Sequence, residues 1–410
     1  MFAFYPPRTL HSVRLLVVFW ALLGVWMALQ LIPLPASLWT ALPGRAKFAN
    51  VYAFAGIEIP AHAVSFAPDR TLSSLLTMLA PGIILFGLAG SESRQREQLV
   101  PIFALLAAVG AFLGAVQLAA GEASPLYFHQ YANRASPIGF FANRNHQAVF
   151  LVMTLPLLRC WVEMPISDSR RAFARNAIAA IFALLIAVIA LVSGSRAGLI
   201  LLCLAIALSA FGGRTRKRTG RFGVSLLVSV VTLTLAAAGA LAMYLGRAQS
   251  IDRAFELELA QEQRVTSLPT LLEMIRDMFP FGSGFGTFDQ LFRSYEPDSA
   301  LSATYLNNAH NDLIELAITG GAPALLILFS FLAWWGWAAI RAFRASPTTP
   351  QLLIARASAS ALLILLLASL ADYPLRTPFL AALFMTLCVL LQFGVGNVRN
   401  AGASVATPVR

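Results

Sequence analysis

Hydrophobic residues along this chain gather in long runs, and short polar segments separate one run from the next. Ten of these runs approach the length that a helix needs to cross a bilayer. They cover residues 15–32, 72–90, 99–120, 147–161, 177–192, 197–211, 222–245, 313–340, 352–371 and 378–394. The pattern therefore predicts an all-α polytopic membrane protein with about ten transmembrane helices.

The composition agrees with this class. Hydrophobic residues make up 58% of the 410 residues and charged residues only 12%, whereas a soluble domain has about twice that charged fraction. The three cysteines, Cys160, Cys203 and Cys388, lie inside or at the ends of apolar runs, and their spacing fits neither a disulfide framework nor a zinc site. We expect one integral membrane domain over residues 1–396, followed by a short cytoplasmic tail over 397–410.

The net charge of +11 is informative because of where the charges lie. The basic run at 214–218 separates two predicted spans, and cytoplasmic loops of membrane proteins are enriched in Lys and Arg. Fixing this loop as cytoplasmic predicts that both termini are cytoplasmic and that loops 33–71, 121–146 and 246–309 face outward. The charge thus reports orientation among membrane lipids, and no nucleic-acid partner is expected.

The loop at 246–309 is long enough to carry structure of its own. Apolar residues recur at helical spacing between 252 and 279, and Pro269 interrupts them, so two helices are expected there. Gly282, Gly284 and Gly286 follow, spaced by aromatic residues. Three glycines allow a tight fold against a helix or close approach to a ligand. No strand precedes them, which excludes a dinucleotide-binding motif.

Chemically useful side chains gather at the predicted outer ends of the spans. His310, Asp312 and Glu315 open the eighth span, where they could form a site or simply cap the helix. Asp312 could orient the His310 imidazole, or act only as a helix acid beside the N-terminal dipole. A contact between His310 and Glu315 is possible but not favoured by their spacing.

Arg196 sits in a very short outer turn. A lone arginine at a span end is most often a lipid anchor. However, Arg264, Arg376 and His310 can reach the same outer surface. Several guanidinium groups there suit a lipid-linked diphosphate, because each binds phosphate oxygens bidentately and stays charged.

Several motifs in this order resemble those of the O-antigen ligase and polymerase superfamily of bacterial polysaccharide assembly. They are Phe-Ala-Asn-Arg-Asn-His at 141–146, Ser-Gly-Ser-Arg-Ala-Gly at 193–198, Arg264, the aromatic glycine segment at 277–288, Ala-His-Asn-Asp at 309–312 with Gly320 and Gly321, and Asp-Tyr-Pro-Leu-Arg-Thr-Pro at 372–378. The resemblance covers about residues 140–395. Each motif is short, but their order and spacing together are fairly specific.

The resemblance implies a membrane glycosyltransferase of the GT-C type in the bacterial inner membrane, with its active site on the periplasmic face. Such an enzyme transfers a glycan from undecaprenyl diphosphate to an acceptor sugar such as lipid A–core, without a metal or other cofactor. By motif, Arg196 and Arg264 would neutralise the diphosphate, and His310 would serve at the acceptor as general base or positioning group. The candidate substrate-binding residues are Asn143, Arg144, Asn311, Asp312 and Arg376.

One position departs from the ligase pattern, which has a Ser two residues after the His, where this chain has Asp312. An O-antigen or exopolysaccharide polymerase of the same superfamily is therefore the alternative. A polysaccharide transporter or flippase is a further alternative, although its binding site would be expected near the bilayer midplane rather than at one face. A scaffold subunit would leave His310 and the outer arginines unexplained.

Overall fold

The computed structural model describes residues 7–129, 133–134, 136–211, 266–298, 306–346 and 349–405. Within them the regular structure is almost entirely helical, apart from two strands of two residues each. The elements are α1 (Pro7–Ser12), α2 (Arg14–Leu29), β1 (Pro33–Leu34), α3 (Ala36–Ala41), α4 (Ala46–Ala55), β2 (His62–Ala63), α5 (Pro68–Thr77), α6 (Leu79–Ala89), α7 (Ser93–Ala120), α8 (Arg144–Glu163), α9 (Ser169–Val192), α10 (Arg196–Phe211), α13 (Leu268–Met278), α14 (Phe288–Phe292), α15 (Asp312–Arg344), α16 (Pro350–Ala368), the 3₁₀ helix η2 (Pro374–Arg376) and α17 (Pro378–Val405).

Nine of the ten predicted spans fall on helices, and the remaining one, 222–245, lies outside the described residues. Among the described residues, six helical segments are long and apolar enough to cross a membrane: Pro68–Ala89, Ser93–Ala120, Ser169–Val192, Asp312–Arg344, Pro350–Ala368 and Pro378–Gly396. Two shorter apolar helices, Arg14–Leu29 and Arg196–Ala210, accompany them. The chain is an α-helical membrane protein, and the count of ten spans remains a prediction.

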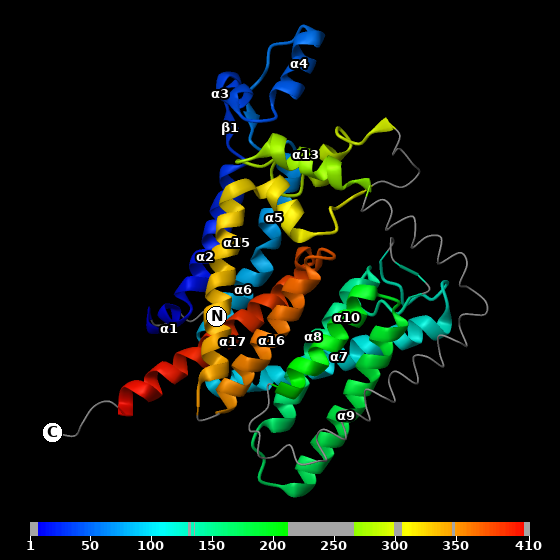
Figure 1. The fold of residues 1–410 in the computed structure, drawn as a ribbon, viewed down its shortest axis with the longest axis vertical. Helices are drawn as coiled ribbons and strands as arrows, with labels where there is room; N and C mark the ends of the chain where they lie inside the picture. The colour runs from blue at the N-terminus through cyan, green and yellow to red at the C-terminus, as the bar shows by residue number, and fades with distance from the viewer. Residues whose placement is uncertain are drawn as a thin grey trace, which may run out of the picture.

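The centre of the bundle is formed by α16, which packs between α17 and α8 (Figure 1). Small residues fill the middle of α16, namely Ala355, Ala357, Ser358, Ala359, Ser360 and Ala361, and all of them are buried. Small side chains let helix backbones approach closely where hydrocarbon, rather than water, surrounds the bundle. On the facing helix α8, every residue from His146 to Leu158 is buried. This packing fixes where the first turn of α8 lies relative to the loop that follows α16.

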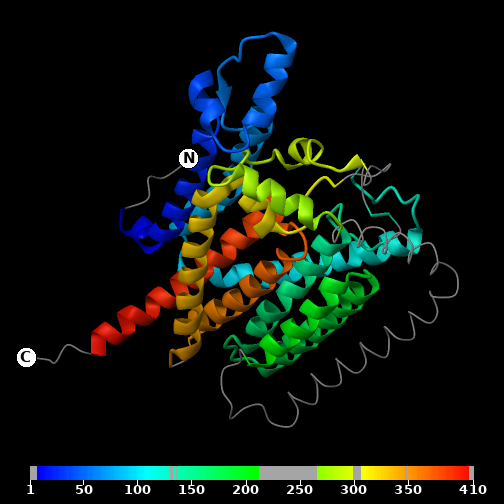
Figure 2. The same ribbon diagram turned by 45° about the horizontal axis from the view of Figure 1, so that its top comes forward.

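Beyond the bundle, β1 pairs antiparallel with β2, and together with α3 and α4 they form a small lobe that projects from one end of the molecule (Figure 2). Arg45 ties this lobe to the rest of the chain. Its side chain is almost fully buried, donates hydrogen bonds to the carbonyls of Val64 and Gly282, and stacks 4.0 Å from the centre of the Phe66 ring. Backbone carbonyl dipoles and the face of an aromatic ring together stabilise the positive charge of this buried guanidinium.

The glycine segment at 279–288 folds tightly against α15, one of the two uses that its sequence predicts. Ser283 and Gly284 donate from their backbone N–H groups to Ile318 and Thr319, at 2.9 and 3.0 Å. α15 is kinked at this contact, because Gly321 has φ 62° and ψ −157° inside the helix. The helix that leads into the segment, α13, begins at Leu268, one residue before Pro269. The expected helix preceding Pro269 lies largely outside the described residues.

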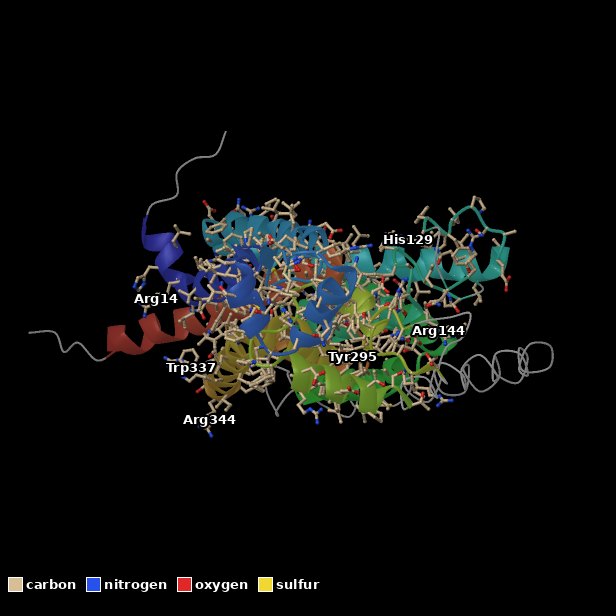
Figure 3. The ribbon with its side chains drawn as sticks, turned by 90° about the horizontal axis from the view of Figure 1, so that it is seen from above. Arg14, His129, Arg144, Tyr295, Trp337 and Arg344 are labelled. Atoms are coloured by element: carbon tan, nitrogen blue, oxygen red, sulfur yellow. The ribbon has the colours of Figure 1, made fainter. Side chains whose placement is uncertain are left out.

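Charged residues at opposite ends of the predicted spans lie apart. Viewed from above, Arg14 at the start of α2 and Arg344 at the end of α15 lie on one side of the molecule, whereas His129 and Arg144 lie on the other (Figure 3). The charge pattern assigns the first pair to the cytoplasmic side and the second pair to the outer side. This assignment of the two sides remains a prediction.

The kink in α15 generates a test of the fold. A Cβ atom on Gly321 would lie 2.1 Å from the carbonyl oxygen of Pro280, and its positive φ already disfavours any side chain. We expect Gly321→Ala to destabilise the protein by about 3 kcal/mol or more, measured by thermal unfolding in detergent. Gly336→Ala is the matched control, because nothing lies within 4 Å of a Cβ there. That change is expected to be neutral or mildly stabilising in a helix interior, and equal effects of the two substitutions would contradict this account.

Candidate active site

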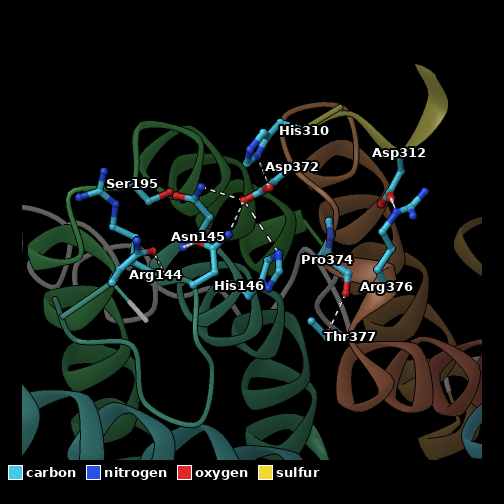
Figure 4. Close-up of polar contacts among 12 residues, drawn as sticks. Arg144, Asn145, His146, Ser195, His310, Asp312, Asp372, Pro374, Arg376 and Thr377 are labelled. Carbon is cyan, nitrogen blue, oxygen red and sulfur yellow. Dashed lines mark hydrogen bonds and ion pairs between the residues drawn. The ribbon is translucent and has the colours of Figure 1, made fainter. Parts of the chain in front are cut away.

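Three helix N-termini and one loop bring the polar residues of the predicted outer face together (Figure 4). Each N-terminus is held by a side-chain cap, since helix starts leave backbone N–H groups unpaired. Asn143 Oδ1 accepts from the N–H of Asn145 at the start of α8, and Asn311 Oδ1 accepts from Leu313 and Ile314 at the start of α15. Ser195 Oγ accepts from Gly198 at the start of α10. The loop is 369–376, which follows α16.

Asp372, in this loop, is the centre of the arrangement. Its side chain is only 4% exposed. Oδ1 lies 3.1 Å from Nδ1 of His310, and Oδ2 accepts from the amide nitrogens of Asn145 and Asn143 at 2.8 and 3.1 Å. The buried imidazole of His146 approaches Oδ2 to 3.9 Å. We call these five residues the Asp372 cluster.

The electrostatics of the cluster favour an ionised Asp372. Burial works to raise the pKa of this carboxyl, but the hydrogen bond from His310, the nearby imidazole of His146 and the amide of Asn145 together lower it to about 2. Hydrogen bonds to the charged form and neighbouring positive charge both favour ionisation. A carboxylate held in this way can stabilise a proton on a histidine without taking that proton itself.

His310 lies at the more open side of the cluster, with its side chain 20% exposed and its ring 5.2 Å from that of Tyr373. Its backbone has φ 48°, the only positive φ at a non-glycine residue in the part of the chain that the structure describes. Such a conformation costs free energy and is common at functional sites. When Nδ1 donates to Asp372, Nε2 is the basic nitrogen of the imidazole. The pair therefore has the geometry of a carboxylate-oriented general base.

Asp312 does not orient His310. It is the first residue of α15, and its Oδ1 lies 3.4 Å from Nε of Arg376, while Glu315 Oε1 lies 2.7 Å from Nη1 of the same arginine. The other oxygen of Glu315 accepts from the backbone N–H of Ala309, the residue before the histidine. The partner of His310 comes instead from the loop after α16, 62 residues further along the chain.

The other predicted residues have varied surroundings. Asn143 belongs to the Asp372 cluster, and Asn311 donates from Nδ2 to the carbonyl of Leu370. The Arg144 guanidinium lies beside the turn between α9 and α10, 3.9 Å from where a Cβ on Gly194 would be. Arg196 is exposed as the first residue of α10. Arg264 lies outside the described residues. The structure therefore brings Asn143, Asn311, Asp312 and Arg376 close to His310, and it leaves the place of Arg264 a prediction.

Sequence reasoning named Glu315 beside His310 but did not single out Asp372 and His146 as members of the site. The signal for Asp372 was present in the Asp-Tyr-Pro-Leu-Arg motif at 372–376, an ionisable residue placed directly after an apolar run. His146 closes the Asn-Arg-Asn-His motif and was equally visible. Within the described ranges, no group of three or more His, Cys, Asp or Glu side chains is arranged to hold a metal ion.

The lowered pKa of Asp372 gives a prediction about acid stability. The ordinary value is 3.8 and the value in the fold is about 2, so the stabilisation is fully present above about pH 4 and is lost as the pH falls through 2. Its size is roughly 2 kcal/mol. In thermal unfolding, the wild type is expected to exceed Asp372→Asn in stability at pH 7, and this gap should shrink at pH 2.5. A gap of equal size at both pH values would show that the ionised form contributes nothing.

One comparison with known proteins finds a family that matches part of this chain. Residues 180–329 match the family model described as O-antigen ligase, a region that contains α10, the first part of α15, Arg196, Arg264 and His310 but not Asp372. A search of curated proteins finds no match to this chain. The match over residues 180–329, together with the order of the motifs, supports a relationship to the O-antigen ligase and polymerase superfamily.

Proposed function

We propose that this protein is a membrane glycosyltransferase that moves a glycan from undecaprenyl diphosphate to an acceptor sugar at the periplasmic face of the inner membrane, as an O-antigen ligase does. The observation that carries the proposal is the hydrogen bond between His310 and the buried Asp372, just before the N-terminus of α15. His310 lies in the part of the chain that matches the O-antigen ligase family model. A hydroxyl acceptor needs a base that works near neutral pH, and an oriented imidazole is such a base.

In the proposed reaction, the acceptor hydroxyl attacks the anomeric carbon of the donor glycan. A carbon–oxygen bond forms to the acceptor as the bond to the diphosphate oxygen breaks, and Nε2 of His310 takes the hydroxyl proton. Asp372 then stabilises the resulting imidazolium through Nδ1–H, at the 3.1 Å contact seen in the structure. Undecaprenyl diphosphate leaves with the electron pair of the broken bond.

The leaving group carries the negative charge that develops in this step, so positive groups near it would lower the barrier. Arg196 is suited to this role because it begins α10, where the helix dipole also favours an anion. Arg144 lies beside the same turn. Arg264 is proposed for the diphosphate on motif order alone. With guanidinium groups supplying the charge, the proposed mechanism needs no metal, and EDTA is expected to leave transfer unchanged.

A polymerase of the same superfamily is the second candidate. It would use the same base and the same donor, but its acceptor would be another carrier-linked glycan instead of lipid A–core. Asp312, which stands where the ligase pattern has Ser, is the residue that keeps this candidate open. A transporter is less well supported, because the Asp372 cluster lies at helix ends and not midway along them.

The first test is transfer from a purified lipid-linked donor. We expect His310→Ala to lower kcat by about 10²–10⁴-fold, the usual contribution of a general base. Asp372→Asn should cause a comparable loss, because an amide can no longer hold the tautomer or stabilise the imidazolium. His129→Ala is the matched control, since His129 is an exposed histidine on the same predicted side. Wild-type rates in His310→Ala would remove the basis of the proposal.

The same assay separates the base from the donor-binding arginines. Arg196→Ala and Arg264→Ala should raise the KM for the donor and lower kcat, by about 10²–10³-fold in kcat/KM if each meets diphosphate charge. Arg196→Lys should recover part of this loss, because the charge remains. If Arg196→Ala leaves donor kinetics unchanged, Arg196 is a lipid anchor only.

A deletion strain distinguishes the two candidates. Loss of all capped bands from the lipopolysaccharide ladder is expected for a ligase. A single-repeat band would instead identify a polymerase. An unchanged ladder would show that the enzyme serves another polysaccharide or acceptor and would overturn the lipid A–core assignment.

A further inference from the structure

The His310 turn, residues 309–312, combines a disfavoured backbone conformation with hydrogen bonds that hold the backbone on both sides of it. His310 has φ 48°, a left-handed conformation that residues with a Cβ adopt only when the surroundings impose it. A residue in that state relaxes toward right-handed or extended backbone unless the chain on both sides is held. The flanking residues Ala309 and Asp312 are both held through their backbone N–H groups.

The tie before His310 runs through a buried ion pair. The N–H of Ala309 donates to Glu315 Oε2 at 2.9 Å, and the other oxygen of Glu315 lies 2.7 Å from Nη1 of Arg376. The Glu315 side chain is only 1% exposed, so its carboxylate depends on these two partners for the solvation it has lost.

The tie after His310 runs to the same loop. The N–H of Asp312 donates to the carbonyl of Ser369 at 2.8 Å, and Asp312 Oδ1 lies 3.4 Å from Nε of Arg376. Asn311 adds a hydrogen bond to Leu370. The loop that supplies Asp372 to the imidazole therefore also supplies the groups that hold the imidazole's own backbone.

We propose that Arg376 and Glu315 form a buttress that keeps His310 in its left-handed conformation on Asp372, so that Arg376 is a positioning residue and not a ligand of the donor diphosphate. This inference rests on the proposed function of His310. Two points support it against diphosphate binding. The Arg376 fork already faces two acidic side chains, which would repel an anion. In addition, Glu315 cannot lose this guanidinium without leaving a buried carboxylate unpaired.

The buttress predicts a particular kinetic pattern. Releasing the turn lets φ of His310 relax and moves the imidazole away from Asp372, and a misplacement of about 1 Å in a catalytic group costs about 10²-fold in rate. Arg376→Gln should therefore lower kcat about 10²-fold while the KM for the lipid-linked donor stays within about threefold. Arg276→Gln is the matched control, because it removes an arginine that is 82% exposed.

The double variant Glu315→Gln/Arg376→Gln sharpens the test. It removes both buried charges, and the new amide at 315 can still accept from Ala309. We expect it to transfer glycan about tenfold faster than Arg376→Gln alone, a non-additivity that a contact between the two side chains produces. A raised donor KM with unchanged kcat in Arg376→Gln would overturn the proposal in favour of diphosphate binding. Strictly multiplicative effects of the two changes would overturn it as well.

A spectroscopic arm keeps this inference separate from the function on which it rests. The chain has only five histidines, so the Nδ1–H proton of His310 can be assigned in ¹⁵N-histidine-labelled protein by comparison with His310→Asn. The hydrogen-bonded proton should be present in the wild type and in Arg276→Gln and absent or shifted in Arg376→Gln. If it is unchanged in Arg376→Gln, the buttress is wrong. If the wild type shows no transfer but the proton responds as expected, the proposed function fails and the buttress stands.

Discussion

The structure depends on the cost of burying one carboxylate. Asp372 is removed from water in the loop that follows α16, and an ionised carboxyl in that position is stable only if protein groups replace its hydration. Those groups come from α8, through Asn145 and His146, from the capping residue Asn143, and from His310 before α15. One charge therefore fixes the relative positions of three helices and determines where the imidazole is held.

The rest of the fold makes this convergence possible. The small residues of α16 let α8 approach, and the first turn of α8 then meets the loop that follows α16. On the other side, the glycine segment packs into the kink of α15 at Gly321, about three turns beyond His310. Arg45 carries this support outward to the lobe around β1 and β2. Packing thus places the helices, and polar contacts at their ends set the geometry.

Some of these features are predictable from sequence and others are not. Spans are predictable because hydropathy sums over some twenty residues and tolerates local noise. His310 stands out because ionisable groups are costly at a membrane boundary. Its partner does not, since Asp312 is two residues away whereas Asp372 is reached only through the packing of α8, α15 and α16. The left-handed backbone of His310 is equally hidden, because sequence rules expect glycine there.

The enclosure of α8 has a consequence for how this protein tolerates change. Neighbouring helices, and not lipid acyl chains, surround α8 from His146 to Leu158, so its side chains are not selected for hydrophobicity alone. The volume and shape of each side chain must instead fit the close-packed space between the helices. The polar residues Thr154 and Gln147 are fully buried in this helix, whereas a larger side chain would overlap its neighbours. Substitutions along this helix should therefore be constrained by the size of the side chain more strictly than by its polarity, the reverse of what a lipid-facing segment shows.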